Sequence, residues 1–363
     1  MTPASITGVR AAAYTVPTDA PESDGTLEWN ATTLVVAHVR AGGREGLGYT
    51  YADTATALLI RDKLAPLLAG ADACATNARW IDMVRAVRNL GRPGIASMAI
   101  SALDAALWDL KGRLLGASVI DLLGAARDSI AAYGSGGFTS YSPERLREQL
   151  GGWAAQGFGA VKMKVGRDAA LDVDRVASAR DAIGPAVRLF VDANGAHTPE
   201  DALRQAGAFA RFDVRWFEEP VSSDDLAGLR LLRQRRPAGM AIAAGEYGYS
   251  AAYFRRMLEA GAVDALQADA TRCGGVTGFL NAAEQADAFG VPLSSHCAPS
   301  LHVALCCAAR RAVHLEWFHD HVRIEQRLFD GCPRPISGRL APDASRPGLG
   351  LEFKEKDAEC FRN

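Results

Sequence analysis

Charged and polar side chains recur along the second half of the chain, each at the end of a short apolar run. They are Lys162, Lys164, Asp192, Glu218, Glu246, Asp269, His296 and Glu316. From Lys164 onward the intervals are all roughly 20 to 30 residues, the length of one strand plus one helix. In a parallel barrel of such units, the carboxyl ends of all strands open on one face, where active sites lie. The spacing therefore predicts a barrel with these side chains gathered at one mouth.

Three of these side chains are carboxylates at the expected ends of neighbouring strands. Asp192, Glu218 and Glu246 would repel one another in a partly buried mouth unless they were protonated or bound to a cation. Oxygen ligands without cysteine or histidine are typical of Mg²⁺, with Mn²⁺ as the alternative. Any one of them alone is more typical of a solvated acid, but three at matching positions favour a metal site.

Lys162 and Lys164 lie two residues apart on one expected strand, so their side chains face the same side. Two ammonium groups cannot occupy the packed middle of a barrel, so we place them at its open end. There each should lower the pKa of the other, which would make a lysine usable as a general base. The alternative is a basic pair on an exposed edge strand.

His296 and Asp269 end the next pair of expected strands, within hydrogen-bonding reach of each other. A carboxylate partner fixes the imidazole tautomer and raises its basicity, which predicts a second base. The alternative is a structural histidine. The remaining histidines are interpreted as structural, with His197 kept open because it follows the Asp192 strand. They are His38, His302, His314, His319 and His321.

Glu316 falls on the eighth expected strand, which closes the barrel against the first. A protonated glutamic acid there could donate a hydrogen bond to a substrate oxygen on the side opposite the metal. Taken by itself, a lone glutamate at a strand end is more typical of a surface residue.

The first third of the chain predicts an α+β domain, residues 1–125. Strands are expected at Ile6–Tyr14, Thr33–Arg40 and Leu47–Tyr51, followed by helices at Thr54–Leu68, Trp80–Arg88 and Ala96–Leu115. Between the first two strands, Pro17–Asn30 is predicted to be a polar loop. Trp29 in this loop would either anchor a lid or pack beneath the loop.

Strand and helix patterns alternate from residue 126 to residue 323. The expected strands are 130–133, 160–164, 188–192, 215–218, 241–244, 265–268, 293–295 and 313–316. The expected helices are 143–156, 169–182, 199–212, 224–233, 250–260, 277–289 and 300–310. Gly134–Gly137 is expected to be a loop. The tail, 324–363, has several prolines and no such rhythm, and should pack back on the first domain.

Composition excludes several function classes. The chain has 363 residues, a net charge of −2 and a pI near 6.4, which gives no electrostatic reason to bind nucleic acid or an anionic membrane. The sequence contains no apolar run long enough to span a bilayer, and its start does not resemble a signal peptide. Seven cysteines without a Cys-x-x-Cys pair indicate reduced thiols and a cytoplasmic protein.

As a set, these motifs resemble the enolase superfamily, and within it the mandelate racemase subgroup (mandelate racemase/muconate lactonizing enzyme-like). The matching stretches are Lys-Met-Lys at 162–164, Asp-Ala-Asn at 192–194, Glu-Glu-Pro at 218–220, Gly-Glu at 245–246, Asp269 with the Ala-Thr-Arg-Cys-Gly-Gly-Val-Thr-Gly after it, Ser-Ser-His at 294–296, and Glu316. The resemblance implies a modified TIM barrel, (β/α)7β, under an N-terminal α+β cap that the C-terminal tail completes. It also implies removal of the proton α to a carboxylate, giving an enediolate.

The resemblance implies a role for each matching residue. Mg²⁺ would be held by Asp192, Glu218 and Glu246. Lys164 would be one base, with Lys162 beside it, and the His296–Asp269 dyad would be the base on the opposite face. Glu316 would be an electrophilic partner of the substrate carboxylate, and Asn194, Ser135 and Lys162 would contact substrate. Trp29 is a further expected substrate contact, from its place in the cap loop rather than from the resemblance. One departure is His197, where many relatives place an aromatic residue.

The favoured function is dehydration of a sugar acid to a 2-keto-3-deoxy acid. Polar residues of the cap suit a polyol chain, namely Glu22, Ser23, Asp24, Glu28, Tyr49 and Tyr51. The alternative is a racemase or epimerase of a 2-hydroxy acid or an amino-acid derivative, because both bases are present. A cycloisomerase is a less favoured enzymatic alternative. The non-enzymatic alternative is a binding protein that retains the barrel without turnover. The expected partners are a small-molecule carboxylate and further copies of the chain, with no nucleic acid or membrane.

Overall fold

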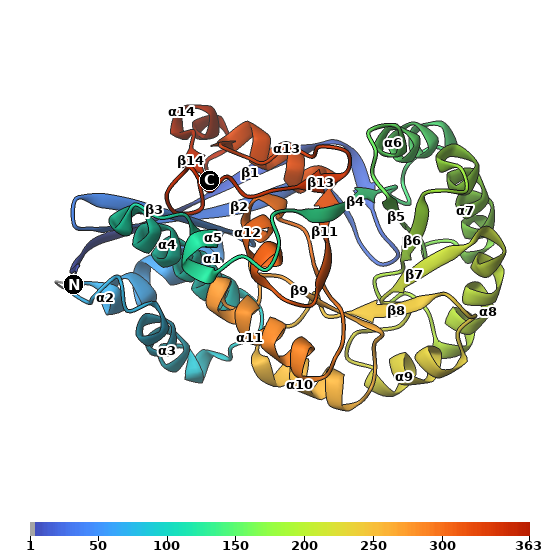
Figure 1. Ribbon diagram of the computed structural model, residues 1–363, viewed down its shortest axis with the longest axis horizontal. Coiled ribbons are helices and arrows are strands. Elements are labelled where there is room, and N and C mark those ends of the chain that lie inside the picture. The colour runs from blue at the N-terminus through green and yellow to red at the C-terminus, as the bar shows by residue number, and fades with distance from the viewer. Residues whose placement is uncertain (1–3) are drawn as a thin grey trace.

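The computed structural model describes residues 4–363, so only the first three residues of the predicted 1–125 domain lie outside it. The N-terminal part is an antiparallel sheet in the order β1-β2-β3, followed by helices (Figure 1). Its elements are β1 (Ile6–Ser23), β2 (Glu28–Ala41), β3 (Arg44–Tyr51), α1 (Ala55–Leu59), a π-helical turn (Ile60–Leu64), α2 (Ala65–Leu68), α3 (Thr76–Ala86), α4 (Ile95–Leu115) and α5 (Val119–Leu123). None of the helices in residues 4–363 combines the length and apolarity needed to cross a bilayer.

Helix α4 packs directly on β3 because glycine faces alanine at the contact. A Cβ atom on Gly46 would lie 2.2 Å from the Ala106 carbonyl oxygen, and one on Gly48 would lie 2.1 Å from that of Ala102. Larger side chains would push the helix away, since packed interiors leave no spare volume. The small alanine side chains of α4 therefore allow the helix to lie close against β3 in the core of the cap.

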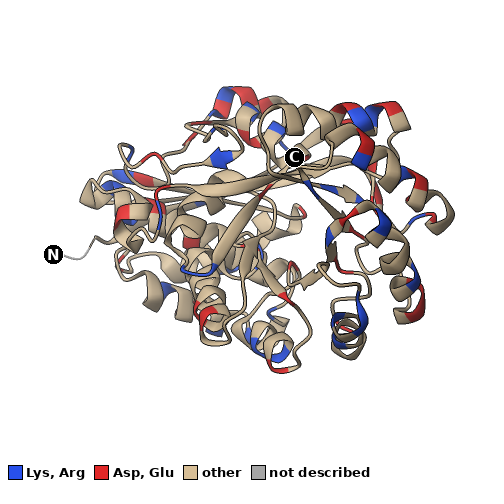
Figure 2. Ribbon diagram, turned by 45° about the vertical axis from the view of Figure 1, so that its right-hand side comes forward, with Lys and Arg blue, Asp and Glu red and all other residues tan. Residues whose placement is uncertain are grey.

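The second part is a closed barrel of eight parallel strands, with β11 paired to β4. The strands are β4 (Ile130–Gly136), β5 (Ala160–Lys164), β6 (Arg188–Asp192), β7 (Val214–Glu218), β8 (Ala241–Ala244), β9 (Ala265–Ala268), β10 (Leu293–Ser295) and β11 (Ala312–Phe318). The helices between them are α6 (Pro143–Ala155), α7 (Ala169–Ile183), α8 (Pro199–Phe209), α9 (Leu226–Arg235), α10 (Ala251–Glu259), α11 (Gly275–Ala288) and α12 (Pro299–Ala308). This arrangement confirms the predicted (β/α)7β fold. Lysine, arginine, aspartate and glutamate are frequent on the outer helices, whereas the long cap strands carry few of them (Figure 2).

The chain after the barrel runs along both parts of the molecule. It forms α13 (His319–Leu328), β12 (Phe329–Asp330), β13 (Arg339–Leu340), β14 (Glu352–Phe353) and α14 (Glu355–Ala358). Strand β13 pairs with barrel strand β4, and the Tyr49 hydroxyl of the cap donates to Glu325 of α13 at 2.8 Å. The tail and α13 thus connect the cap to the barrel.

Two segments predicted to be loops are strands in the structure. The loop prediction for Pro17–Asn30 is wrong for most of its length, because β1 and β2 continue as a hairpin to Ser23 and Glu28. The far end of this hairpin reaches the barrel mouth (Figure 1), where the Ser23 carbonyl accepts from the Thr139 amide at 2.8 Å. Gly134–Gly137 is likewise largely strand, since β4 stays paired with β5 as far as Gly136. The hairpin pairs residues that are near in sequence but rests on the barrel, and β4 pairs with the distant strand β5, so local composition alone indicated turns.

Asp109 on α4 offers a direct test of how the parts are joined. Its completely buried carboxylate accepts from the Leu47 amide of β3 and the Leu349 amide of the tail, both at 2.7 Å, and from Arg113 at 2.7 Å. Asp109→Ala should lower the free energy of unfolding by about 3 kcal/mol, since it strands buried amide donors. Urea denaturation measures this, with the exposed Asp62→Ala as control, and a loss matching the control would contradict it.

Candidate active site

A cavity of about 420 Å³ lies where the barrel's strand ends meet the cap. Barrel side chains form its floor, and β2, β3 and the hairpin turn of the cap form its roof. Its lining includes Lys164, Asn194, Glu246, Asp269, Arg272, His296, Cys297, Glu316 and His321 from the barrel side, and Asp24, Trp29, Thr32, Thr33, Tyr51 and Asp53 from the cap. The position agrees with the rule that barrel enzymes work at this face.

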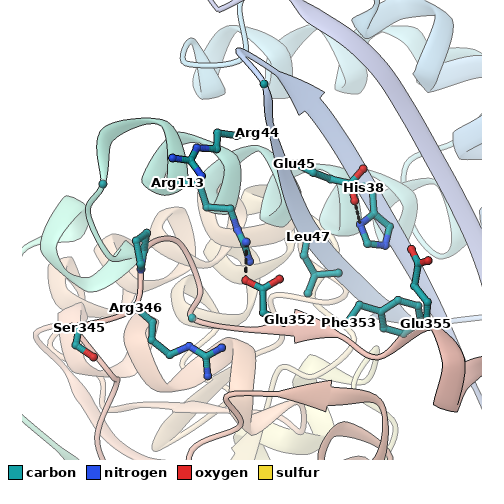
Figure 3. A pocket seen from close by; sticks show the side chains of 14 residues that line it. His38, Arg44, Glu45, Leu47, Arg113, Ser345, Arg346, Glu352, Phe353 and Glu355 are labelled. Carbon is teal, nitrogen blue, oxygen red and sulfur yellow. Dashed lines mark hydrogen bonds and ion pairs between the residues drawn. The ribbon is translucent and has the colours of Figure 1, made fainter.

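A larger crevice, about 610 Å³, lies between the cap and the tail (Figure 3). Several of its charged side chains pair with each other: Arg113 donates to Glu352 at 2.7 Å, and His38 lies 3.2 Å from Glu45. A cleft whose charges already neutralise one another has little left to bind a charged substrate. The catalytic residues expected from sequence are all elsewhere.

The structure brings the three predicted metal ligands together. Asp192, Glu218 and Glu246 are at most 2% exposed, and one oxygen from each lies within 4.8 Å of the others. Asp192 and Glu218 are register partners on β6 and β7. Glu246 reaches the cluster because Gly245 has a φ of 137°, and a Cβ there would lie 2.1 Å from the Gln267 carbonyl oxygen.

This cluster fits a hard divalent cation. The Glu246 Oε2 atom is buried without a hydrogen-bond partner, as expected of an oxygen that binds an ion. Burial and the neighbouring Asp192 raise the pKa of Glu218, so three bare charges are unfavourable here. All ligand atoms are carboxylate oxygens, the set preferred by Mg²⁺.

Both lysines point into the cluster, but their pKa values move opposite to the sequence prediction. Lys164 donates to Asp192 at 2.5 Å, and Lys162 lies 2.8 Å from Glu316 and also donates to Glu218. Although burial lowers the pKa of each lysine, the carboxylates outweigh both burial and mutual repulsion and raise it. The prediction considered only the like-charged neighbour, which is the smaller influence here. Lys162 is 1% exposed and lies two residues before Lys164, which ends β5.

His296 and Asp269 form the predicted dyad. The His296 Nδ1 atom lies 2.8 Å from Asp269 Oδ2, and both residues are buried. His296 Nε2 is left on the cavity side, 3.4 Å from Glu246 Oε2 and 3.2 Å from Cys297 Sγ. Burial lowers the pKa of His296, but Glu246 and then Asp269 raise it above its usual value.

The surroundings of Glu316 lower its pKa, which favours the carboxylate over the proton donor expected from sequence. Burial opposes this, but the Lys162 ammonium followed by His296 holds its pKa well below the usual range. Its carboxylate accepts from Ser135 Oγ at 2.6 Å and from the Cys297 amide at 2.7 Å. Ser135 is completely buried and donates to Glu316 without lining the cavity, and its contact with substrate stays a prediction.

Asn194 and Trp29 both line the cavity, as their predicted contact with substrate requires. Asn194 Oδ1 accepts from Lys164 at 3.1 Å, so this residue also orients the lysine. Trp29 packs edge-on against Phe138 and donates to Glu22 at 2.9 Å. Trp29 therefore packs beneath the hairpin, as one of the two sequence interpretations has it, and also faces the cavity. The lid role of the other interpretation stays a prediction.

Sequence reasoning missed Arg272 and His321. Arg272 donates to Glu246 at 3.2 Å, lies 3.6 Å from Asp269 and stacks over Tyr247. Its place three residues after Asp269, in the loop after a barrel strand, was the available signal. His321, interpreted as structural, stacks on Tyr51 and lines the cavity. Nothing local marked it, because it follows the last strand.

Not every polar cap residue reaches the cavity. Asp24 and Tyr51 line it, whereas Tyr49 is completely buried and donates to Glu325. His197, the departure from the expected aromatic, is half-buried and packs edge-on against Phe217. It thereby fills an aromatic position without joining the catalytic cluster.

Comparison with known proteins identifies the family. Residues 9–124 match the model of the mandelate racemase/muconate lactonizing enzyme N-terminal domain, and residues 145–357 match the enolase C-terminal domain-like model. The chain belongs to this family of the enolase superfamily. The sequence resemblance is thereby confirmed.

Three similar proteins illustrate the family, and two of them are named for an activity. A mandelate racemase/muconate lactonizing enzyme-like protein from Rubrobacter xylanophilus is 52% identical, with a TM-score of 0.96 over 99% of both chains. L-talarate dehydratase from Polaromonas, solved with Mg and L-glucarate, is 32% identical, with a TM-score of 0.89 over 99% of this chain and 98% of that one. The 3,6-anhydro-alpha-L-galactonate cycloisomerase of Streptomyces coelicolor is 33% identical over 95% of this chain and 97% of its own.

Proposed function

We propose that the protein is a Mg²⁺-dependent dehydratase that converts a sugar acid to a 2-keto-3-deoxy acid. The observation that carries the proposal is a pair of basic groups, Lys164 and His296, on either side of a buried carboxylate cluster in a polar cavity. Family relatives named as an arabinonate dehydratase, an L-talarate/galactarate dehydratase and a 3,6-anhydro-alpha-L-galactonate cycloisomerase support the same substrate class.

Asp192, Glu218 and Glu246 would hold the cation. When bound, Mg²⁺ would draw electrons from the substrate carboxylate and take up the charges on Asp192 and Glu246 that otherwise raise the pKa of Lys164 and His296. The Polaromonas relative, which contains Mg and a sugar diacid, supports this assignment.

The two bases occupy opposite sides of the barrel. Strands β4 and β11 separate β5, which carries Lys164, from β10, which precedes His296. We assign removal of the proton at C2 to Lys164, which leaves the electron pair of the broken C–H bond on the substrate as an enediolate. Collapse of this enediolate breaks the C3–O bond, and His296 Nε2 protonates the departing hydroxyl, so that water leaves and the enol becomes the keto acid.

Asp269 and Arg272 support this assignment of His296. The Asp269 carboxylate binds Nδ1, so the proton to be transferred sits on Nε2, on the cavity side. Arg272 lies beside Asp269 and Glu246, and its charge adds to that of His296 in lowering the pKa of Asp269 against burial. The hydroxyl-rich chain of the substrate would meet Asp24, Thr32 and Asp53 of the cap.

Glu316→Gln should lower kcat by about ten- to a hundredfold and change KM much less. The three groups that contact the Glu316 carboxylate, Lys162, Ser135 and Cys297, are all donors. An amide places its own NH₂ group against one of them, which disturbs Lys162 and the segment that holds His296. Steady-state kinetics with Ser135→Ala as control, which removes one donor only, measures this. A raised KM at constant kcat would reduce Glu316 to a binding role.

A racemase or epimerase of a 2-hydroxy acid or an amino-acid derivative is the second candidate, because a base stands on each side of the cavity. A cycloisomerase is a third, since a relative with that activity is 33% identical. For the same reason, the lower rank of the cycloisomerase in the sequence analysis is not kept. The experiment is product analysis of aldonic and aldaric acids incubated with enzyme and Mg²⁺. Formation of a 2-keto acid supports dehydration, and a new lactone or anhydro ring without keto acid overturns it.

A further inference from the structure

A second cluster of metal-binding side chains lies where the cap hairpin meets the barrel. Asp19 and Glu22 come from β1, and His319 is the first residue of α13, three residues after Glu316. One ligand atom from each lies within 4.8 Å of the others. In the described structure, none of the three lines the catalytic cavity.

A break in strand pairing places Asp19 toward the barrel. Between Pro17 and Glu22 the register with β2 shifts, so that residues 18–21 stand opposite Asn30 alone. Such bulges turn side chains away from the direction that regular pairing would give them. Asp19 Oδ2 then lies 3.1 Å from His319 Nε2, and Asp19 Oδ1 accepts a hydrogen bond from Arg145 at 3.0 Å.

Glu22 supplies the independent indication of a missing ligand. The residue is completely buried, and its Oε2 atom accepts from the Trp29 indole at 2.9 Å. Its Oε1 atom is also buried and has no hydrogen-bond partner, although buried polar atoms in folded proteins are nearly always paired.

We infer that Asp19, Glu22 and His319 bind a divalent transition-metal ion such as Zn²⁺, which joins the cap hairpin to the barrel. One imidazole nitrogen and two carboxylate oxygens are a ligand set for Zn²⁺ or a similar first-row ion, whereas the catalytic cluster offers oxygen alone. Glu22 Oε1 is the atom that the ion would satisfy. Arg145 on the other oxygen of Asp19 fixes the direction of that carboxylate, as outer hydrogen bonds do at metal sites.

The site would act on the catalytic cavity through Trp29. Glu22 holds the indole nitrogen of Trp29, and the same side chain lines the cavity and packs on Phe138. An ion at Glu22 therefore fixes the hairpin, and with it part of the cavity roof. Zn²⁺ should raise the melting temperature of the wild type more than that of a variant lacking His319.

Zinc content after dialysis measures the site in the full-length, Mg²⁺-loaded protein. The variants His319→Gln and Glu22→Gln should each bind one Zn²⁺ per chain fewer than the wild type. The matched control is His38→Gln, a cap histidine that also lies beside a carboxylate, Glu45, at 3.2 Å, and it should bind as much zinc as the wild type. Glu246→Gln removes any Zn²⁺ from the catalytic cluster and should keep the ion at His319.

Anomalous diffraction at the zinc edge on wild-type crystals needs no variant, so it stays decisive if a substitution disturbs folding. A peak between Asp19, Glu22 and His319 is expected. Equal zinc binding by the wild type and His319→Gln, an equal loss in His38→Gln, or no peak at saturating Zn²⁺ would each overturn the inference. None of these results depends on which reaction the catalytic cavity performs.

Discussion

Glu218→Gln should reduce kcat/KM roughly a thousandfold, because a catalytic metal supplies several kcal/mol and each 1.4 kcal/mol is tenfold in rate. Glu218 is the middle one of the three clustered carboxylates and also binds Lys162 and the Trp216 indole. The glutamine side chain carries no charge, and its NH₂ group would face either Lys162 or the Trp216 indole, both of which are donors. It should therefore bind Mg²⁺ weakly and hold Lys162 less well.

Thermal melting and calorimetry separate loss of metal from loss of fold. Mg²⁺ should raise the melting temperature of the wild type and have little effect on Glu218→Gln. The control is Glu325→Gln, an equally buried glutamate that accepts from Tyr49 and Ser300 outside the cluster. Chelation should abolish activity of the wild type and of the control. Normal turnover by metal-stripped protein would refute the ligand assignment.

Lys164→Ala and His296→Asn should each lower the rate of dehydration by roughly a hundred- to ten-thousandfold, the usual contribution of a general acid or base. If Lys164 removes the proton at C2 and His296 protonates the leaving group, the two losses differ in kind. Lys164→Ala should stop exchange of the C2 proton with solvent. His296→Asn should keep some exchange while losing net product.

Exchange of the C2 proton in D₂O, followed by NMR, distinguishes these cases. Asp269→Asn is the matched control for the dyad, because it keeps the imidazole and removes the carboxylate 2.8 Å from Nδ1. Like His296→Asn, this variant should keep exchange at C2 and lose net product, but the loss of product should be smaller. If each variant instead exchanged the proton of one stereoisomer and failed on the other, the two groups would be the paired bases of a racemase.

Much of the barrel could be predicted because each unit is local. The strands at 160–164, 188–192, 241–244, 265–268 and 293–295 have the predicted bounds. Short apolar runs followed by helical periodicity specify them without distant information. The metal cluster and the dyad followed from strand order, since residues at the ends of adjacent parallel strands must approach each other.

The remaining differences come from contacts between distant segments. The extended hairpin through Pro17 and Ser23 forms because it rests on the barrel mouth, which composition does not reveal. The direction of the lysine pKa shifts depends on carboxylates from three other strands. The lowered pKa of Glu316 has the same origin, since Lys162 approaches it across the barrel closure.

The most direct test of the proposed reaction is the NMR spectrum of the products formed from sugar acids with wild-type enzyme and Mg²⁺ in D₂O. Dehydration predicts a 2-keto-3-deoxy acid that carries solvent deuterium at C3, and none of it without Mg²⁺. Recovery of the acid as a mixture of C2 stereoisomers labelled with deuterium at C2, with no keto acid, would contradict dehydration and establish racemisation or epimerisation instead.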